Sequence, residues 1–424
     1  MSDPKHEVWR PTDEQVDAAN VTRLMRAHDI DRFEDLVRRS IDEPAWFWDA
    51  VVRDLDLEFS TPYGEIVDSS RGPAWATWFV GGRTNVARQC VDRWAERTPS
   101  ALAVVWEGED DEVRTATYQE LRRQTDAVAR ALMSLGVARG VTVGIFLPMA
   151  IETVATVMAC SKLGAIWVPI FSGFGPDAVA ARLTDAGCRV LVTANGSLRK
   201  GVPVPMKAIA DRAIEMAGGL DHVLVWERLP SYGELRAGRD HRWSDVVVLD
   251  AEPFDATPLD AEQPLFIAYT SGTTGRPKGA VHVHGGFLVK IAEEVAYQVD
   301  LHPGEVLHWS TDLGWIMGPW EIVGALALGA TVLLTEGAPT HPGPDRLWEQ
   351  VARHGVTTLG VSPTLVRALI AAGSQPRRHN RERLRVLAST GEPWNPDAYL
   401  WLHREVGDER LPIVNLSEIG RAHV

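Results

Sequence analysis

Two patterns of hydrophobic and polar positions alternate along most of this chain of 424 residues. Short apolar runs are typical of buried strands, and longer stretches with apolar residues every three or four positions are typical of helices. Between residues 115 and 228 the two alternate regularly. The pattern there predicts helices at 118–135, 151–163, 177–186 and 206–218, and strands at 141–147, 165–170, 188–193 and 222–226.

Residues 229–263 interrupt this alternation with several prolines, glycines and acidic residues, which is typical of a surface linker. A second series of elements follows. It predicts strands near 265–270, 305–311, 331–336, 357–361, 385–389 and 411–416, and helices near 285–298, 319–328, 345–354, 364–372 and 396–405.

Strands that alternate with helices favour a mainly parallel sheet covered by helices on both faces. The chain is therefore predicted to have an α/β fold with two similar helix-covered, mainly parallel sheet subdomains. Such folds bind ligands at the carboxyl ends of their strands and at strand-order reversals. We expect an N-terminal extension and entry to the main domain at 1–114, a first subdomain at 115–228, a linker at 229–263 and a second subdomain at 264–417.

The formal net charge of −14 argues against a nucleic-acid partner and against an anionic membrane surface. A local basic pocket for phosphates stays compatible with this charge. Three cysteines, Cys90, Cys160 and Cys188, lack metal-ligand spacing and indicate free thiols in a reducing compartment. Because the first residues are charged and no apolar run is long enough to span a bilayer, we expect a cytoplasmic protein with no membrane partner.

An acidic run, Glu-Gly-Glu-Asp-Asp-Glu, occupies residues 107–112 between two strand-like segments. A cation site is one interpretation of such a run. A solvated hairpin turn explains it more simply, and this is the expectation adopted.

The segment Tyr-Thr-Ser-Gly-Thr-Thr-Gly-Arg-Pro-Lys-Gly at 269–279 follows a predicted strand and carries the most informative chemistry. Glycines permit backbone N–H groups to converge on one point, which makes an anion site. Lys278 adds a full positive charge, and hydroxyl groups can follow a phosphoryl group or join a Mg²⁺ shell. The predicted phosphate turn therefore consists of Ser271, Gly272, Thr273, Thr274, Gly275 and Lys278.

This segment is not a Walker A loop, in which the lysine directly follows the last glycine. Here Arg276 and Pro277 separate Gly275 from Lys278, so a P-loop NTPase is disfavoured. A plain hairpin turn with a solvated lysine stays open as an alternative for any glycine-rich loop.

The phosphate turn resembles the signature of the AMP-forming adenylating superfamily, and further motifs resemble its acetyl-CoA synthetase-like acyl-CoA synthetases. They occur in the family's order along nearly the whole chain. They are Trp-Phe-Val-Gly-Gly-Arg-Thr-Asn at 78–85, Phe-Ser-Gly-Phe at 171–174, Thr-Asp-Leu-Gly-Trp at 311–315, Val-Ser-Pro-Thr at 361–364 and Thr-Gly-Glu-Pro at 390–393. The resemblance implies the large N-terminal domain of these enzymes, with two sheet subdomains and a smaller β portion.

It also implies a reaction in which a carboxylate attacks the α-phosphate of ATP·Mg²⁺, giving an acyl-adenylate and pyrophosphate. The thiol of CoA then displaces AMP. On this basis Lys278 and Thr274 are catalytic candidates, and the phosphate turn binds ATP. By resemblance Gly391, Glu392 and Pro393 line the adenine pocket, with an ordinary strand-to-helix turn as the alternative.

The acyl pocket, again by resemblance, is lined by Trp315, Ile316, Met317 and Thr390. In acetyl-CoA synthetases a tryptophan of a later motif forms the floor of this pocket. This chain has Val-Asn-Leu-Ser at 414–417, where that motif begins, and the tryptophan is absent. Since one methylene changes discrimination by only about 1–3 kcal/mol, the expected substrate is a small to medium carboxylic acid rather than acetate alone.

For CoA, the resemblance places Gly173 beside the pantetheine arm and Arg199 on the phosphates. The family usually has Arg-Gly-Gly-Lys/Arg there, whereas this chain has Arg-Lys-Gly-Val at 199–202. A surface Arg-Lys pair in water is the alternative. His282 and His284 share one face of a predicted strand, but without a third ligand nearby we expect packed or hydrogen-bonded histidines rather than zinc ligands.

In the family that the motifs resemble, a segment with a Mg²⁺-binding glutamate and then a small C-terminal domain would follow the position of Ser417. This chain instead has Glu-Ile-Gly-Arg-Ala-His-Val at 418–424. We interpret 418–424 as an artefactual tail of a truncated gene, and expect weak or no turnover from this chain. Two alternatives are an adenylating domain that loads a carrier protein and a non-catalytic nucleotide-binding fragment. The sequence leaves the acid and the oligomeric state open.

Overall fold

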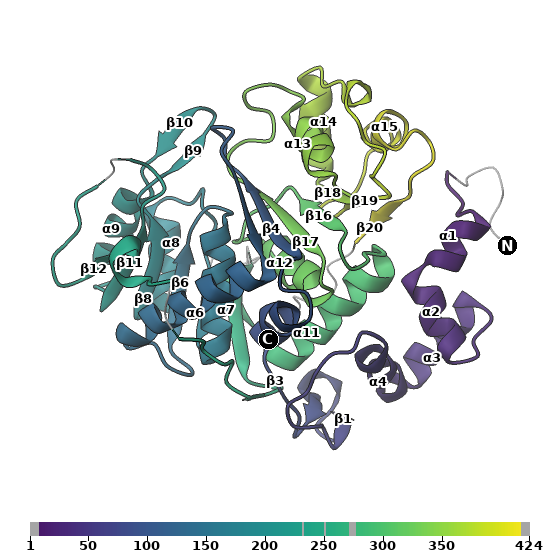
Figure 1. The fold of residues 1–424 in the computed structure, drawn as a ribbon, viewed down its shortest axis with the longest axis horizontal. Helices are drawn as coiled ribbons and strands as arrows, with labels where there is room; N and C mark the ends of the chain where they lie inside the picture. The colour runs from purple at the N-terminus through teal and green to yellow at the C-terminus, as the bar shows by residue number, and fades with distance from the viewer. Residues whose placement is uncertain (1–7, 231–232, 250–251, 271–276, 417–424) are drawn as a thin grey trace.

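Two sheets of seven strands each dominate the part of the chain that the structure describes (Figure 1). This computed structural model describes residues 8–230, 233–249, 252–270 and 277–416. The name first sheet is used for the sheet in which most strands come from the first half of the chain. Its order is β12 (Asp240–Arg242), β11 (His222–Trp226), β8 (Val190–Ala194), β6 (Thr142–Phe146), β7 (Ile166–Pro169), β14 (Pro264–Thr270) and β15 (Lys278–Val283).

The second sheet contains the later strands. Its order is β20 (Ile413–Asn415), β19 (Val386–Ser389), β18 (Thr358–Val361), β16 (Val306–Trp309), β17 (Thr331–Thr335), β4 (Leu102–Glu107) and β5 (Val113–Thr117). Neighbouring strands are parallel in both sheets except for one antiparallel pair at an edge of each, β14 with β15 and β4 with β5. The mainly parallel, helix-covered α/β fold predicted from the sequence is confirmed.

Helices cover the sheets, and all of them except a four-residue helix within 229–263 lie where the polar and apolar pattern predicted them. Along the first half they are α6 (Tyr118–Ser134), α7 (Ile151–Leu163), α8 (Pro176–Asp185), α9 (Met206–Met216) and α10 (Trp243–Val246). Along the second half they are α11 (His284–Glu293), α12 (Met317–Ala327), α13 (Arg346–His354), α14 (Pro363–Ala371) and α15 (Pro396–Trp401). Short π-helical turns extend α11 through Gln298 and α15 through Val406.

Local sequence signals explain where several of these helices begin and end. The Thr117 side chain accepts a hydrogen bond from the backbone N–H of Glu120, while the Glu120 side chain accepts one from the N–H of Thr117. This capping box starts α6 directly after β5. Helix α7 ends at Gly164, whose φ of 68° is the left-handed conformation that glycine adopts at helix ends.

Helices α7 and α12 are buried along their entire length. Both belong to a hydrophobic core that also contains Ile145 of the first sheet and Leu307 of the second. Burial of apolar surface contributes most of the stability of such a core. The two halves therefore share one continuous core, and their sheets are held in a fixed relation.

The N-terminal region packs onto this body as short helices and strand pairs. They are α1 (Asp13–Ala18), α2 (Asn20–Ala27), α3 (Phe33–Asp42), α4 (Pro44–Asp54), β1 (Glu65–Asp68), β2 (Thr77–Val80), β3 (Arg83–Thr84) and α5 (Arg93–Arg97). The strands β1 and β2 pair with each other, and β3 pairs with β13 (Leu259–Asp260). A hairpin of β9 (Ser197–Arg199) and β10 (Val202–Val204) follows β8.

The predicted domain boundaries need a correction, because each sheet takes strands from the other half of the chain. Strand β14, expected to open the second subdomain, pairs in parallel with β7 of the first sheet through Phe266 and Trp167. Strand β4, within the range expected to hold the N-terminal extension and the entry to the main domain, pairs with β17 of the second sheet. The predicted linker 229–263 is also not a plain linker, because β12, α10 and β13 lie within it. Which sheet a strand joins depends on which neighbouring strand has an unpaired edge in space. The local pattern of apolar and polar residues does not contain that information.

The acidic run at 107–112 forms the predicted hairpin turn between β4 and β5, but the expectation that it is solvated is wrong at its start. Glu107 is buried, and it accepts hydrogen bonds from Gln350 (2.9 Å) and Arg353 (2.9 Å) and lies 2.6 Å from Nε2 of His354. Burial alone would raise the pKa of the Glu107 carboxyl, but these partners outweigh it and lower the pKa to about 2.

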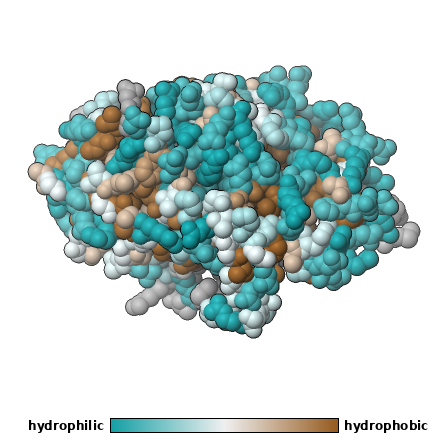
Figure 2. Space-filling model, turned by 60° about the horizontal axis from the view of Figure 1, so that its bottom comes forward, coloured by the Kyte–Doolittle hydropathy of each residue, from teal (hydrophilic) through white to brown (hydrophobic). Residues whose placement is uncertain are grey.

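Hydrophilic residues predominate on the face drawn in Figure 2, and hydrophobic residues form small scattered groups there. Of the helices in the described ranges, not one combines the length and the apolar character that crossing a bilayer demands. The three cysteines are buried free thiols, and burial raises the pKa of each.

Candidate functional site

The predicted site residues follow the carboxyl ends of strands in both sheets. Gly173 lies in the loop after β7, Trp315 lies in the loop after β16, and Gly391 lies in the loop after β19. Parallel strands place these ends at one edge of a sheet, where ligands of open α/β folds collect. These three candidates therefore lie at the edges at which ligands would be expected, and their roles stay predictions.

A buried carboxylate, Asp312, joins the loop after β16 to the loop after β7. The hydroxyl of Ser172 donates to Asp312 Oδ2 at 2.5 Å, and the backbone N–H groups of Ser172 and Gly314 donate to Oδ1 at 3.3 and 2.9 Å. Burial raises the pKa of Asp312, and these donors act in the opposite direction. The contact fixes a loop of the second sheet against a loop of the first.

Close backbone packing tightens this junction. A Cβ atom added at Gly314 would lie 2.2 Å from the backbone nitrogen of Phe171, so only glycine fits there. The ring of Phe171 lies 5.6 Å from the ring of Trp315 and 5.2 Å from that of Phe174. Sequence reasoning missed Asp312 and Ser172 as site residues, although both lie inside motifs that it singled out.

The predicted phosphate turn falls mostly outside the described residues, because Ser271, Gly272, Thr273, Thr274 and Gly275 are not among them. The flanks are described. Thr270 and Lys278 are partners in the antiparallel ladder of β14 and β15, and Lys278 is exposed. The phosphate-turn interpretation and the plain-hairpin interpretation both predict this geometry.

Helix α8 links the strand that leads to this turn with the loop after β7. The guanidinium of Arg182 lies over the ring of Phe174 at 4.3 Å and over the ring of Tyr269 at 5.5 Å. The hydroxyl of Tyr269 donates to Asp185 of the same helix at 2.6 Å. Tyr269 directly precedes Thr270, so α8 positions the end of β14 relative to Phe174. No short motif pointed to Arg182.

The predicted acyl-pocket residues occupy two places on the second sheet. Trp315 is 52% exposed, Ile316 is half-buried, and Met317 is buried at the start of α12. Thr390 follows β19, which is separated from β16 by β18. Its hydroxyl donates to the backbone carbonyl of Leu416 at 2.7 Å, so Thr390 contacts the segment that lacks the tryptophan expected from the family.

The segment predicted to line the adenine pocket, Gly391 to Pro393, also holds a neighbouring helix in place. Gly391 has a φ of 100°, which favours glycine. Glu392 accepts hydrogen bonds from the hydroxyl of Thr364, from Arg367 at 2.8 Å and from the backbone N–H of Thr364 at 2.7 Å. These contacts, the Thr364 hydroxyl first among them, lower the pKa of the Glu392 carboxyl. Glu392 thus holds the first turn of α14, and Pro393 follows it on the surface.

The two residues predicted for CoA lie on loops of the first sheet. Gly173 is exposed, and a Cβ there would lie 2.6 Å from the ring of Phe171, so the position requires the absence of a side chain. Arg199 ends β9 and is exposed. Burial raises the pKa of Asp312, and the charge of Arg199 is a smaller influence that opposes this rise.

The two histidines do not share a strand as predicted. His282 lies in β15 and its ring stacks on Phe266 at 4.4 Å. His284 begins α11, is fully buried and accepts a hydrogen bond from the backbone N–H of Val86 at 3.3 Å. Burial lowers the pKa of His284 to about 3. Across the described ranges no three His, Cys, Asp or Glu side chains come together in a way that can hold a metal ion.

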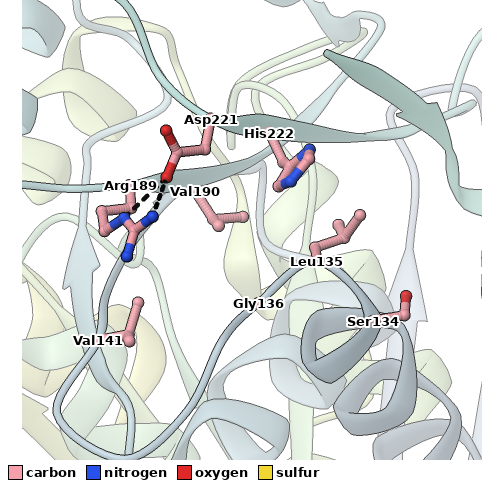
Figure 3. Close-up of a pocket in the computed structure, with 8 residues that line it drawn as sticks. All are labelled: Ser134, Leu135, Gly136, Val141, Arg189, Val190, Asp221 and His222. Atoms are coloured by element: carbon pink, nitrogen blue, oxygen red, sulfur yellow. Dashed lines mark hydrogen bonds and ion pairs between the residues drawn. The ribbon is translucent and has the colours of Figure 1, made fainter. Parts of the chain in front are cut away.

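A separate hollow of about 520 Å³ lies at the other edge of the first sheet (Figure 3). It lies where β6, β8 and β11 begin, and an ion pair of Arg189 with Asp221 (2.6 Å) crosses its wall. None of the described candidate site residues lines it. This hollow therefore lies away from the predicted chemistry, which belongs to the carboxyl ends of the strands.

Comparison with known proteins agrees with the motifs at that edge. Residues 91–417 match the family described as AMP-binding enzyme, and residues 33–90 match the one described as acetyl-coenzyme A synthetase N-terminus. The chain belongs to the AMP-binding enzyme family. The resemblance inferred from the motifs is confirmed.

Curated relatives of this AMP-binding enzyme include acetyl-coenzyme A synthetases. That of Xanthobacter autotrophicus is 40% identical over 90% of the chain and 59% of the relative, and that of Deinococcus radiodurans is 40% identical over 93% and 60%. The solved acetoacetyl-CoA synthetase from Streptomyces lividans has a TM-score of 0.89 at 30% identity, covering 97% of this chain and 64% of that one. The chain thus spans about three fifths of the length of these proteins.

Proposed function

We propose that the protein is an AMP-forming acyl-CoA synthetase that activates a small to medium carboxylic acid. A carboxylate oxygen bonds to the α-phosphorus of ATP as pyrophosphate leaves, and the sulfur of CoA then bonds to the acyl carbon as AMP leaves. The observation that carries the proposal is the Asp312 junction. It brings loops from the carboxyl ends of two sheets together inside a chain that matches the AMP-binding enzyme family.

Each group of candidate residues has a part in this proposal. The phosphate turn with Thr274 and Lys278 would hold the triphosphate, since positive charge and oriented N–H groups stabilise transferring phosphoryl groups. The segment from Gly391 to Pro393 would line the adenine. Mg²⁺ would enter with ATP and neutralise phosphate charge, and the hydroxyls of the phosphate turn are the groups of this chain that suit its oxygen preference.

The pocket is proposed to accept carboxylic acids larger than acetate. Thr390 contacts the backbone of Leu416, in the segment where the expected tryptophan is absent, and Trp315 is exposed next to half-buried Ile316. The relatives named acetyl- and acetoacetyl-CoA synthetases mark the range from two to four carbons as the one to test. CoA is proposed to pass Gly173 and to meet Arg199 with its phosphates.

The experiment is thioester formation from ATP and CoA with acetate, propionate, butyrate and acetoacetate. Turnover of acids with three or four carbons supports the proposal. Turnover of acetate alone would contradict the proposal that the pocket accepts larger acids. Acyl transfer to a carrier protein but not to CoA would contradict the proposal that the protein is an acyl-CoA synthetase. ATP binding without any acid-dependent pyrophosphate release would indicate a nucleotide-binding protein instead.

A further inference from the structure

Arg182 on α8 is a buried cation whose neighbours are aromatic rings. It is 8% exposed, and its Cζ atom lies 4.3 Å from the centre of the Phe174 ring and 5.5 Å from that of the Tyr269 ring. Within the described ranges no carboxylate lies at ion-pair distance from Arg182. A cation over an aromatic ring is attracted more strongly where water is excluded, so these two rings take the place of an ionic partner.

The helix itself fixes the guanidinium of Arg182. One of its N–H groups donates to the backbone carbonyl of Ala178, one turn earlier in α8, at 2.8 Å. The ring of Tyr269 is tied to the same helix, because its hydroxyl donates to Asp185 at 2.6 Å. Arg182 is therefore a fixed support for the ring of Phe174.

A series of ring contacts leads from Phe174 to Trp315. Phe174 meets Phe171 edge-to-face at 5.2 Å, and Phe171 meets the indole of Trp315 at 5.6 Å. Trp315 is 52% exposed, and in the described part of the chain the ring beside it is that of Phe171. Since aromatic pairs prefer particular relative orientations, the orientation of Phe174 affects that of Phe171 and, through it, that of Trp315.

We propose that Arg182 is a positioning residue for the acyl pocket. Acting through Phe174 and Phe171, it fixes the indole of Trp315 and so determines which length of acid the pocket prefers. The proposal rests on the proposed function, in which Trp315 lines that pocket. An indole without this support moves aside for a longer acid and makes less contact with acetate.

The first test observes the indole directly and needs no activity. Protein labelled with 5-fluorotryptophan is studied by fluorine NMR, and Trp315→Phe identifies the resonance of Trp315. We expect Arg182→Met, which removes the charge and the planar group, to shift or broaden that resonance. Arg189→Met is the matched control, because Arg189 is exposed and pairs with Asp221 at 2.6 Å at the other edge of the first sheet. An unchanged Trp315 resonance in Arg182→Met would overturn the inference.

The second test is the ratio of kcat/KM for butyrate to that for acetate in acid-dependent exchange of pyrophosphate with ATP, which involves no CoA. In Arg182→Met we expect this ratio to rise about three- to tenfold, mainly through a higher KM for acetate. Arg182→Lys keeps the charge but not the planar group, so its ratio should lie between those of Arg182→Met and the unmodified protein. Arg189→Met should keep the unmodified ratio. A smaller folded fraction slows both acids equally, so lost stability alone does not change the ratio.

Phe174→Leu tests the route from Arg182 to Trp315. If Arg182 acts through Phe174, the ratio in the double variant should equal that in Phe174→Leu alone, because the two residues act as one unit. A further change on adding Arg182→Met would overturn this route.

The failure of the inference can be told apart from that of the proposed function. Equal slowing of both acids in Arg182→Met would reduce Arg182 to a structural contact and overturn the inference, while the proposed function would stand. Exchange by the unmodified protein that no acid stimulates would overturn the proposed function and the inference with it, even if the Trp315 resonance moves.

Discussion

Ser172 and Asp312 lie 140 positions apart in the chain, yet the hydroxyl of Ser172 donates to the carboxylate of Asp312 at 2.5 Å. Ser172 follows β7 of the first sheet and Asp312 follows β16 of the second. The bond therefore crosses between the loops of two sheets at their carboxyl ends. A site assembled there depends on this junction as much as on the residues that would touch a ligand.

Loss of the Asp312 carboxylate should destabilise the protein. Asp312→Ala leaves two N–H groups and one hydroxyl without their buried acceptor, and we expect the free energy of unfolding to fall by about 2–4 kcal/mol. Asp312→Asn keeps an acceptor and a donor of the same shape and should lose less than half of that. Chemical denaturation followed by tryptophan fluorescence measures both. Equal losses in the two variants would show that hydrogen bonding is not the reason.

A methyl group at Gly314 should force the two loops apart. Its Cβ would lie 2.2 Å from the backbone nitrogen of Phe171, and a backbone atom cannot move aside as a flexible side chain can. We expect Gly314→Ala to lower the free energy of unfolding by about 2 kcal/mol or more. Gly343→Ala is the matched control, because no atom lies within 4 Å of a Cβ there. Similar stability of the two variants would refute the close packing at the junction.

The carboxyl of Glu321 on α12 should give the protein a specific pH dependence. Glu321 is 1% exposed and accepts a hydrogen bond from the backbone N–H of Trp309 at 2.8 Å. Burial raises its pKa well above the ordinary value. The folded protein thus keeps a proton that the unfolded chain releases above about pH 4.3, so stability should fall as pH rises from there toward the folded-state pKa.

Glu321→Gln cannot ionise and removes that loss. Between the two pKa values the variant should gain stability over the unmodified protein by about 1.4 kcal/mol per pH unit. Parallel denaturation series at several pH values measure the difference, so other titrating groups cancel. A difference that does not change with pH would mean that the Glu321 carboxyl has an ordinary pKa.

The local pattern was sufficient for most of the long helices and central strands but not for their assembly. Residues 264–270 have the apolar run of a buried strand, and β14 is such a strand. Whether it joins β7 or the later strands depends on which edge is free in space. Glu107 shows the same limit, because its partners Arg353 and His354 are more than 240 residues away in sequence. Nothing near an acidic run indicates that such partners exist.

In the candidate site, too, local motifs could be predicted from the sequence, whereas contacts between distant segments could not. Motif positions such as Gly173, Trp315 and Gly391 fall at the predicted edge, because motif and strand end are close in sequence. Residues that act by holding such loops, namely Asp312 and Arg182, depend on contacts between distant segments. Sequence reasoning could find Asp312 by asking which lone charged residues follow a strand, but Arg182 lies within a helix, where that question does not find it.

Acid-dependent exchange of pyrophosphate with ATP, compared between the unmodified protein and Lys278→Ala, tests the central claim most directly. The claim is that the segment between β14 and β15 binds the triphosphate of ATP and that Lys278 stabilises its transfer. We expect Lys278→Ala to slow exchange by about a hundredfold or more with little change in the carboxylate concentration required. Arg189→Ala, at the opposite edge of the sheet, should exchange normally. Exchange that survives in Lys278→Ala at the unmodified rate would contradict the account.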